Sequence, residues 1–174
     1  MKKKLSAIVC ILILMCFNSL IAQKLNNEEM FKQYFITHID SLDHIEGIWN
    51  VNTEQQFFRY DTLYEERKYP KAAKVAIIKR NGKYDSFNLT GESYNVEFLP
   101  TEVQGVFLYK NNFIETGSST KTSAVISKNG TMEYTYDFPD DYLRYKFDDS
   151  YEEGTKVTNH LIWNKVFPEK NAVK

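Results

Sequence analysis

The stretch Leu42-Asp43-His44-Ile45-Glu46-Gly47-Ile48-Trp49-Asn50-Val51 decides the fold of this chain. An apolar helical segment ends here, and Gly47 permits a sharp bend into the first strand. Successive side chains of a strand point to opposite faces, so Trp49 and Val51 share one face. We therefore expect Trp49 and Val51 to point into a core.

Residues 27–42, just before the bend, carry the pattern of a helix. Asn27 can cap the helix, and Glu28 and Glu29 would lie in its first turn, where negative charge is favourable. Apolar side chains recur at helical spacing, namely Phe31, Tyr34, Phe35, Ile39 and Leu42. We interpret this stripe as a surface that packs on a sheet.

Residues 74–89 predict a β-hairpin, because Asn81-Gly82 supplies the positive φ angles of a type I′ turn. The two-residue turn sets the register and places Ala76 opposite Phe87 and Ile77 opposite Ser86. Both faces of this hairpin then carry apolar and polar residues. The pattern does not identify the inner face.

The rest of the chain predicts further short strands. We expect strands over 94–99, 104–110, 121–127, 131–138 and 156–167, a turn at 111–112 and a charged loop over 61–71. Met132, Tyr134 and Tyr136 would share one face of their strand. Leu143, Tyr145 and Phe147 alternate with charged residues and predict one more strand with an apolar inner face.

The connections are too short for parallel crossovers, so the sheet must be antiparallel. The sequence therefore predicts a mainly β fold, an antiparallel up-and-down β-barrel of about 8–10 strands preceded by one N-terminal helix.

Two motifs resemble those of the lipocalin-like (calycin) barrels, and especially of uncharacterised secreted lipocalin-like proteins of Gram-negative bacteria. Ile45-Glu46-Gly47-Ile48-Trp49 resembles their first-strand motif, and Trp163-Asn164-Lys165-Val166-Phe167-Pro168 resembles their last-strand motif. True lipocalins place an arginine over the first tryptophan, whereas this chain offers Lys165. The resemblance implies that Gly47, Trp163 and Lys165 close the barrel, with Trp163 or Lys165 packed beside Trp49.

Residues 1–22 have the pattern of a secretory signal peptide: three lysines, an apolar run and small or neutral residues before Ala22. An uncleaved membrane anchor is the alternative. Cleavage would leave one domain over 23–174, exported to the periplasm or beyond, with no stable membrane insertion. Both cysteines, Cys10 and Cys16, would be removed, so no disulfide would form. Without Lys2, Lys3 and Lys4, 19 basic residues face 23 acidic ones, so nucleic acid is not an expected partner.

No catalytic motif occurs, and we name no catalytic residue, metal ligand or cofactor. His38, Asp40, Asp43 and His44 crowd the end of the helix, yet their spacing does not place them on one helical face as a zinc site needs. The acidic residues between 140 and 153 lack the pattern of a calcium loop, and we interpret them as a solvated rim. His160 has no partner at a motif spacing. Catalysis stays a third, weaker hypothesis.

The leading functional hypothesis is a barrel that binds a small apolar or amphipathic molecule inside, without a cofactor. The inward residues would be Trp49, Val51, Met132, Tyr134, Tyr136, Leu143, Tyr145 and Phe147. The alternative is an envelope or extracellular module whose barrel is filled by its own side chains and whose surface contacts another protein. The 12 tyrosines, more than one small core can hide, favour this alternative.

Overall fold

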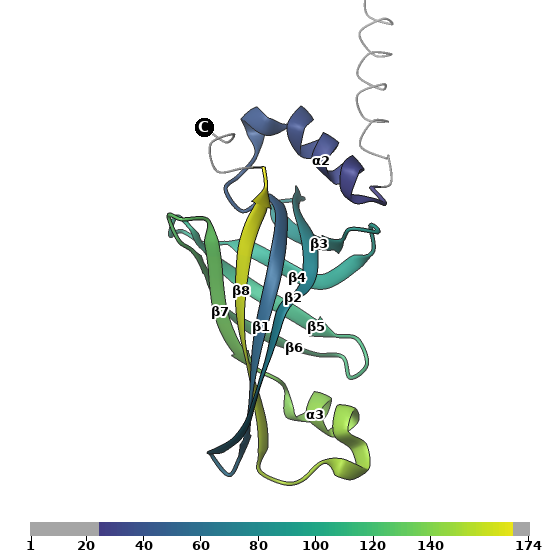
Figure 1. The fold of residues 1–174 in the computed structure, drawn as a ribbon, viewed down its shortest axis with the longest axis vertical. Helices are drawn as coiled ribbons and strands as arrows, with labels where there is room; N and C mark the ends of the chain where they lie inside the picture. Colours follow the sequence, from purple (N-terminus) through teal and green to yellow (C-terminus); the bar gives the residue numbers. More distant parts are fainter. Residues whose placement is uncertain (1–24, 169–174) are drawn as a thin grey trace, which may run out of the picture.

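The computed structural model describes residues 25–168, which form a closed barrel of eight antiparallel strands (Figure 1). Each strand pairs with the next, and the last pairs with the first, which confirms the predicted up-and-down barrel. The strands are β1 (Gly47–Arg59), β2 (Thr62–Arg80), β3 (Lys83–Asn88), β4 (Ser93–Pro100), β5 (Val106–Phe113), β6 (Ser118–Ile126), β7 (Thr131–Asp137) and β8 (Thr155–Phe167). The proposed signal peptide, residues 1–22, lies outside the described residues.

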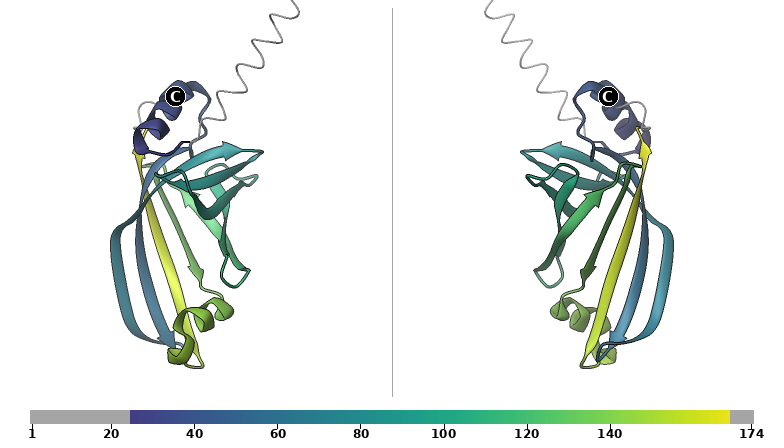
Figure 2. Two further views of the ribbon diagram at one scale, coloured as in Figure 1. Left: turned by 90° about the vertical axis from the view of Figure 1, so that its right-hand side faces the viewer. Right: turned by 90° about the vertical axis from the view of Figure 1, so that its left-hand side faces the viewer.

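Helix α2 (Glu28–Thr37) precedes the barrel and lies across one of its ends (Figures 1 and 2). The side chain of Asn27 accepts a hydrogen bond from the backbone N–H of Met30 at 2.9 Å, which is the expected cap. A short 3₁₀ turn, η2 (Ile39–Ser41), follows, so the α-helix ends before residue 42. Phe31 and Phe35, one turn apart, are fully buried.

The helix covers the outer face of the neighbouring strands. Phe31 and Phe35 form a cluster there with Ile48 of β1 and with Ala76 and Ile78 of β2. Residues Ile77 and Val75 on the opposite face belong to the barrel interior. Both faces of the β2–β3 hairpin are therefore buried near the helix, which explains why its sequence does not alternate. Its register is the predicted one, with Ala76 opposite Phe87.

The prediction of a loop over 61–71 is wrong, because the long strand β2 begins at Thr62. They pair with β1 along its whole second half, so the backbone groups that face β1 are hydrogen-bonded although the side chains are charged and exposed. Pairing with β3 covers only Val75–Arg80, so the outer edge of Thr62–Ala73 carries no strand. Charged residues and Pro70 along this edge discourage pairing with another chain.

The prediction of a strand at Leu143, Tyr145 and Phe147 is also wrong, because Asp140–Phe147 forms helix α3. Leu143 and Phe147 are four residues apart, a spacing that fits one face of a helix as well as a strand pattern. Asp140 and Asp141 lie in its first turn, and Asp140 pairs with Arg144 one turn later at 2.7 Å. A 3₁₀ turn, η3 (Asp148–Ser150), then leads towards β8.

The turn expected at 111–112 lies further along, because β5 continues to Phe113 and turns after it. The β5–β6 hairpin tilts away from β7, as Figure 1 shows. β6 and β7 pair at Val125–Glu133 and Ile126–Met132. Beyond these positions the two strands separate towards the end where α3 lies. The barrel is thus tight at the α2 end and looser at the α3 end.

Candidate functional site

The inward side chains of β7, β8, β1 and β2 form rows across the sheet, because opposed residues in a sheet point to one face. The row at the α2 end joins Lys165, Trp49 and Val75. The next rows towards α3 are Met132–Trp163–Val51–Ala73, then Tyr134–Leu161–Thr53–Tyr69, then Tyr136–Asn159–Gln55–Arg67. The interior is therefore apolar around Trp163, polar in the row of Tyr136 and Asn159, and apolar again where Phe57 and Val157 pack against α3.

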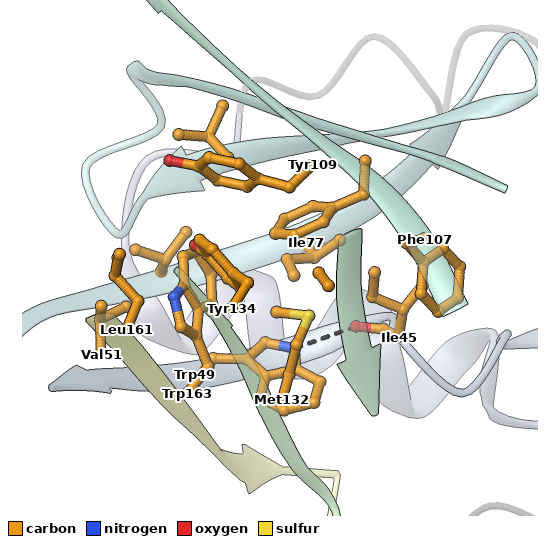
Figure 3. Packing of buried hydrophobic residues seen from close by; sticks show 14 of the residues in the cluster. Ile45, Trp49, Val51, Ile77, Phe107, Tyr109, Met132, Tyr134, Leu161 and Trp163 are labelled. Carbon is orange, nitrogen blue, oxygen red and sulfur yellow. Dashed lines mark hydrogen bonds between the residues drawn. The ribbon is translucent and has the colours of Figure 1, made fainter. Parts of the chain in front are cut away.

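Trp49 and Lys165 close the α2 end. Trp49 is fully buried and donates a hydrogen bond from Nε1 to the Ile45 carbonyl at 2.9 Å, drawn in Figure 3. The Lys165 ammonium lies 5.5 Å from the centre of the Trp49 ring and donates to the His44 carbonyl at 2.8 Å. Burial lowers the pKa of Lys165 to about 8, against a raising influence of Glu46.

Glu46 ties the segment after α2 to the barrel wall. It is 3% exposed, and its carboxylate accepts from the backbone N–H groups of Asp43 and Lys79, both at 2.9 Å. The Asp43 carboxylate accepts from Lys79 Nζ at 2.7 Å and from the Tyr84 hydroxyl at 2.8 Å. The Lys79 hydrogen bond is the largest cause that lowers the pKa of Asp43. The carboxylates of this end are thus structural.

Aromatic rings fill the middle of the barrel. The Tyr109 ring centre lies 4.2 Å from that of Tyr134 and 5.5 Å from that of Tyr136. Phe98 meets the Trp163 ring edge to face at 5.7 Å. Figure 3 shows Tyr109, Tyr134 and Trp163 converging from different strands. Their rings provide a flat apolar surface inside the barrel.

Several of these polar atoms lack hydrogen-bond partners. Trp163 Nε1, the Tyr134 hydroxyl and Asn159 Oδ1 are buried and have no partner in good hydrogen-bonding geometry within residues 25–168, although the side chains of Tyr109 and Trp163 lie near enough to the Tyr134 hydroxyl to lower its pKa against the larger effect of burial. Their residues are 0%, 4% and 5% exposed. The other half of the Asn159 amide donates to the Tyr136 hydroxyl at 2.9 Å. Leaving such a buried group without a hydrogen bond costs about 1–3 kcal/mol. A bound molecule that hydrogen-bonded to this cluster would therefore recover part of that free energy.

The tyrosines of the cluster stay neutral. Burial raises the pKa of Tyr109 and of Tyr134 well above the ordinary value, and it also raises the pKa of Tyr136. Neutral hydroxyls can both donate and accept hydrogen bonds. The cluster therefore offers uncharged hydrogen-bonding groups on an aromatic surface.

Charge appears at the rim. Arg67, opposite Gln55, has a side chain that is 49% exposed and binds the Glu65 carboxylate through two hydrogen bonds of 2.6 and 2.9 Å. Its guanidinium also lies 4.7 Å from the Phe57 ring centre. The Arg67 charge is thus compensated by Glu65 within the same strand.

A second aromatic group closes part of the α3 end. Phe113 at the end of β5 lies 4.4 Å from Tyr142 of α3 and 5.7 Å from Phe138, measured between ring centres. Phe138 in turn contacts Tyr136 at 5.5 Å. The rings of Phe113, Phe138 and Tyr142 lie between α3 and the polar interior.

The structure brings together five of the eight residues expected inside. Trp49, Val51, Met132, Tyr134 and Tyr136 belong to the interior cluster, as does Trp163. Leu143 instead packs with Phe57 and Val157 in a separate cluster, where Phe147 is partly buried. Tyr145 is 59% exposed. These three residues lie on α3, so the inward face expected for them does not exist.

Sequence reasoning missed Tyr109, Phe98 and Asn159. Tyr109 alternates with Phe107, and that pattern was a usable signal. Asn159 interrupts the apolar alternation of Val157, Leu161 and Trp163 on β8, where a polar residue on an apolar face marks a special environment. Phe98 likewise alternates with Tyr94 and Val96, so the same signal was present there.

The histidines lie apart from this cluster. His38 stacks on Tyr34 at 4.3 Å between ring centres, and its Nδ1 is 2.8 Å from the Tyr34 carbonyl. His160 lies on the outer face, with Nδ1 3.8 Å from Glu54. Across the described part of the chain, no three His, Cys, Asp or Glu side chains converge as metal ligands would. Between residues 25 and 168, no helix has the length and apolar character needed to cross a membrane.

Comparisons with models of known protein families, with curated proteins and with solved structures found no match to this chain. Its antiparallel eight-stranded barrel is consistent with a lipocalin-like fold.

Proposed function

We propose that this protein is exported and binds a small amphipathic molecule inside its barrel. One observation carries the proposal: unpartnered polar atoms of Tyr134, Asn159 and Trp163 lie in an aromatic interior. Small-molecule sites combine apolar walls with a few convergent polar groups in this way. The apolar row of Trp49 would receive the apolar part of a ligand, and the row of Tyr136 and Asn159 would receive its polar part.

A titration with N-phenyl-1-naphthylamine, an uncharged aromatic probe, tests binding. Energy transfer from Trp49 and Trp163 to the probe would report entry into the barrel. We expect saturable transfer with an affinity in the micromolar range, as an order of magnitude. Native mass spectrometry of the protein purified without denaturation would show whether a molecule copurifies.

Two tryptophan substitutions separate interior binding from surface binding. Ala73 is partly buried against the interior cluster, and its neighbour Ala72 is exposed. Ala73→Trp would place an indole in the inward row of Val51 and Trp163 and should weaken probe binding about tenfold or more. Ala72→Trp adds the same group outside and should leave binding unchanged. Equal effects of the two substitutions would contradict a site inside the barrel.

Export is tested separately. The lysines at 2–4 and the apolar run that follows support cleavage after Ala22. N-terminal sequencing of the exported form should begin at Gln23. Recovery of protein that retains Met1 from membranes would support the anchor instead.

The second candidate, a protein-interaction module, is favoured by the tip of the β1–β2 hairpin. Tyr60, Leu63 and Tyr64 are 70%, 48% and 53% exposed there. Absence of saturable probe binding, together with no copurifying molecule, would place this candidate first.

A further inference from the structure

We infer that the ligand of the interior site is uncharged and carries hydroxyl, carbonyl or amide groups, rather than a carboxylate or phosphate. This inference rests on the proposed function and narrows it to a chemical class. It starts from the unpartnered atoms of Tyr134, Asn159 and Trp163.

Each of these atoms can form only certain hydrogen bonds with a ligand. Trp163 Nε1–H can only donate, so it needs an acceptor on the ligand, and Asn159 Oδ1 can only accept, so it needs a donor. The Tyr134 hydroxyl can do either. Tyr134 stands opposite Leu161, on the row between those of Asn159 and Trp163, so the unmet groups extend along the barrel. An alcohol or amide on an elongated apolar frame supplies both a donor and an acceptor.

The row of Tyr134 offers no countercharge for an anion, because the Lys165 ammonium lies two rows away. Among the described residues, Glu46 is the one buried side chain that carries a charge, and it is negative and held by two backbone N–H groups. Lys165 lies at the α2 end and donates to the His44 carbonyl. Arg67 at the rim is paired with Glu65. A carboxylate brought to the Tyr134 row would lose its hydration without gaining an ion pair.

The rings favour a slender or flat ligand. Tyr109 and Tyr134 lie 4.2 Å apart between ring centres, and Tyr109 and Tyr136 lie 5.5 Å apart. Rings at these separations are in contact, so no ligand fits between them and a ligand must lie beside them. An alkyl chain or a single flat ring has the shape to do so.

Three probes with one chain length test the inference. Decanol, decanamide and decanoate differ in their polar group, and decanoate carries its negative charge at about pH 7.5. Each would displace N-phenyl-1-naphthylamine from the full exported protein. We expect decanol and decanamide to displace the probe and decanoate to bind about tenfold or more weakly.

A matched pair of substitutions locates the polar contact. Tyr134→Phe removes the unpartnered hydroxyl and should weaken decanamide binding about tenfold more than it weakens binding of N-phenyl-1-naphthylamine. Tyr145→Phe removes a hydroxyl from the exposed residue on α3 and should change neither affinity. Asn159→Leu is the second variant and should weaken decanamide binding in the same way.

The outcomes separate the inference from the proposed function. Decanoate binding as tightly as decanamide, or binding that depends on Arg67 in an Arg67→Gln variant, would overturn the inference and leave an interior site. Failure of N-phenyl-1-naphthylamine itself to bind would overturn the proposed function. Unchanged decanamide affinity in Tyr134→Phe and Asn159→Leu would show that water, not ligand, satisfies these atoms, and would also overturn the inference.

Discussion

The Lys165 ammonium lies 5.5 Å from the centre of the Trp49 ring, on the strand that pairs with Trp49. This contact joins the first and last strands where the barrel closes. It holds a cation over an aromatic face, as the resemblance to lipocalin-like barrels suggested for a lysine in place of arginine. The groups at this end of the barrel are closely packed, so substitutions there should affect stability.

Gly47→Ala should lower the free energy of unfolding by about 2–4 kcal/mol. A Cβ at Gly47 would lie 2.3 Å from the Phe167 carbonyl oxygen and 2.7 Å from Lys165 Cε, and its φ of +144° disfavours a side chain. Gly82→Ala is the control, because its φ is +78° but no atom lies within 4 Å of the added Cβ. Urea unfolding should show a loss of about 1 kcal/mol there, from backbone conformation alone. Equal losses at both sites would contradict the close approach of β8.

Trp49→Ala should lower the free energy of unfolding by about 3–5 kcal/mol, because it removes a fully buried indole from the closing contact. Trp49→Phe keeps much of the ring surface but loses the hydrogen bond to the Ile45 carbonyl, so its cost should be smaller. Chemical denaturation of both variants measures this order. A melting temperature unchanged in Trp49→Ala would be incompatible with the closed barrel.

Stability should depend on the protonation of Lys165. Its pKa is about 8 in the folded protein and 10.5 in its ordinary environment, so the unfolded chain binds the extra proton between these values. The contribution of Lys165 to stability should therefore rise from pH 8 to 10.5 and be constant below pH 8. The difference in unfolding free energy between the unaltered protein and Lys165→Met isolates this effect from the tyrosines. A difference that stays flat or falls over this range would contradict the burial of Lys165.

Tyr134→Phe and Tyr136→Phe should differ in stability although they remove the same atom. The Tyr134 hydroxyl is buried and unpartnered, so its loss should leave the unfolding free energy unchanged or raise it. The Tyr136 hydroxyl accepts from Asn159, so its loss should cost about 1–2 kcal/mol. Thermal unfolding of the ligand-free variants tests the order. Destabilisation by Tyr134→Phe would mean that its hydroxyl is already satisfied.

The sequence by itself determined the barrel, because local features specify it. Gly47 before Trp49, the Asn81-Gly82 turn and the alternation of Met132, Tyr134 and Tyr136 each act within a few residues. Short connections then leave an antiparallel meander as the way to pair the strands. The helix cap at Asn27 is equally local.

Tertiary structure alone decided the elements whose side-chain pattern was ambiguous. Residues 62–73 form a strand because β1 offers hydrogen-bond partners along one of their edges, whatever their charge. Residues 140–147 form a helix because the four-residue spacing of Leu143 and Phe147 lets one face pack on Phe57 and Val157.

The candidate site was likewise decided by long-range packing. Asn159 meets Tyr136, and Tyr109 meets Tyr134, across strands separated by more than twenty residues of sequence. Sequence patterns predict which side chains face inward but not which polar atoms find partners. That depends on distances set by the closure of the barrel, and it leaves Tyr134, Asn159 and Trp163 with unmet hydrogen-bonding capacity.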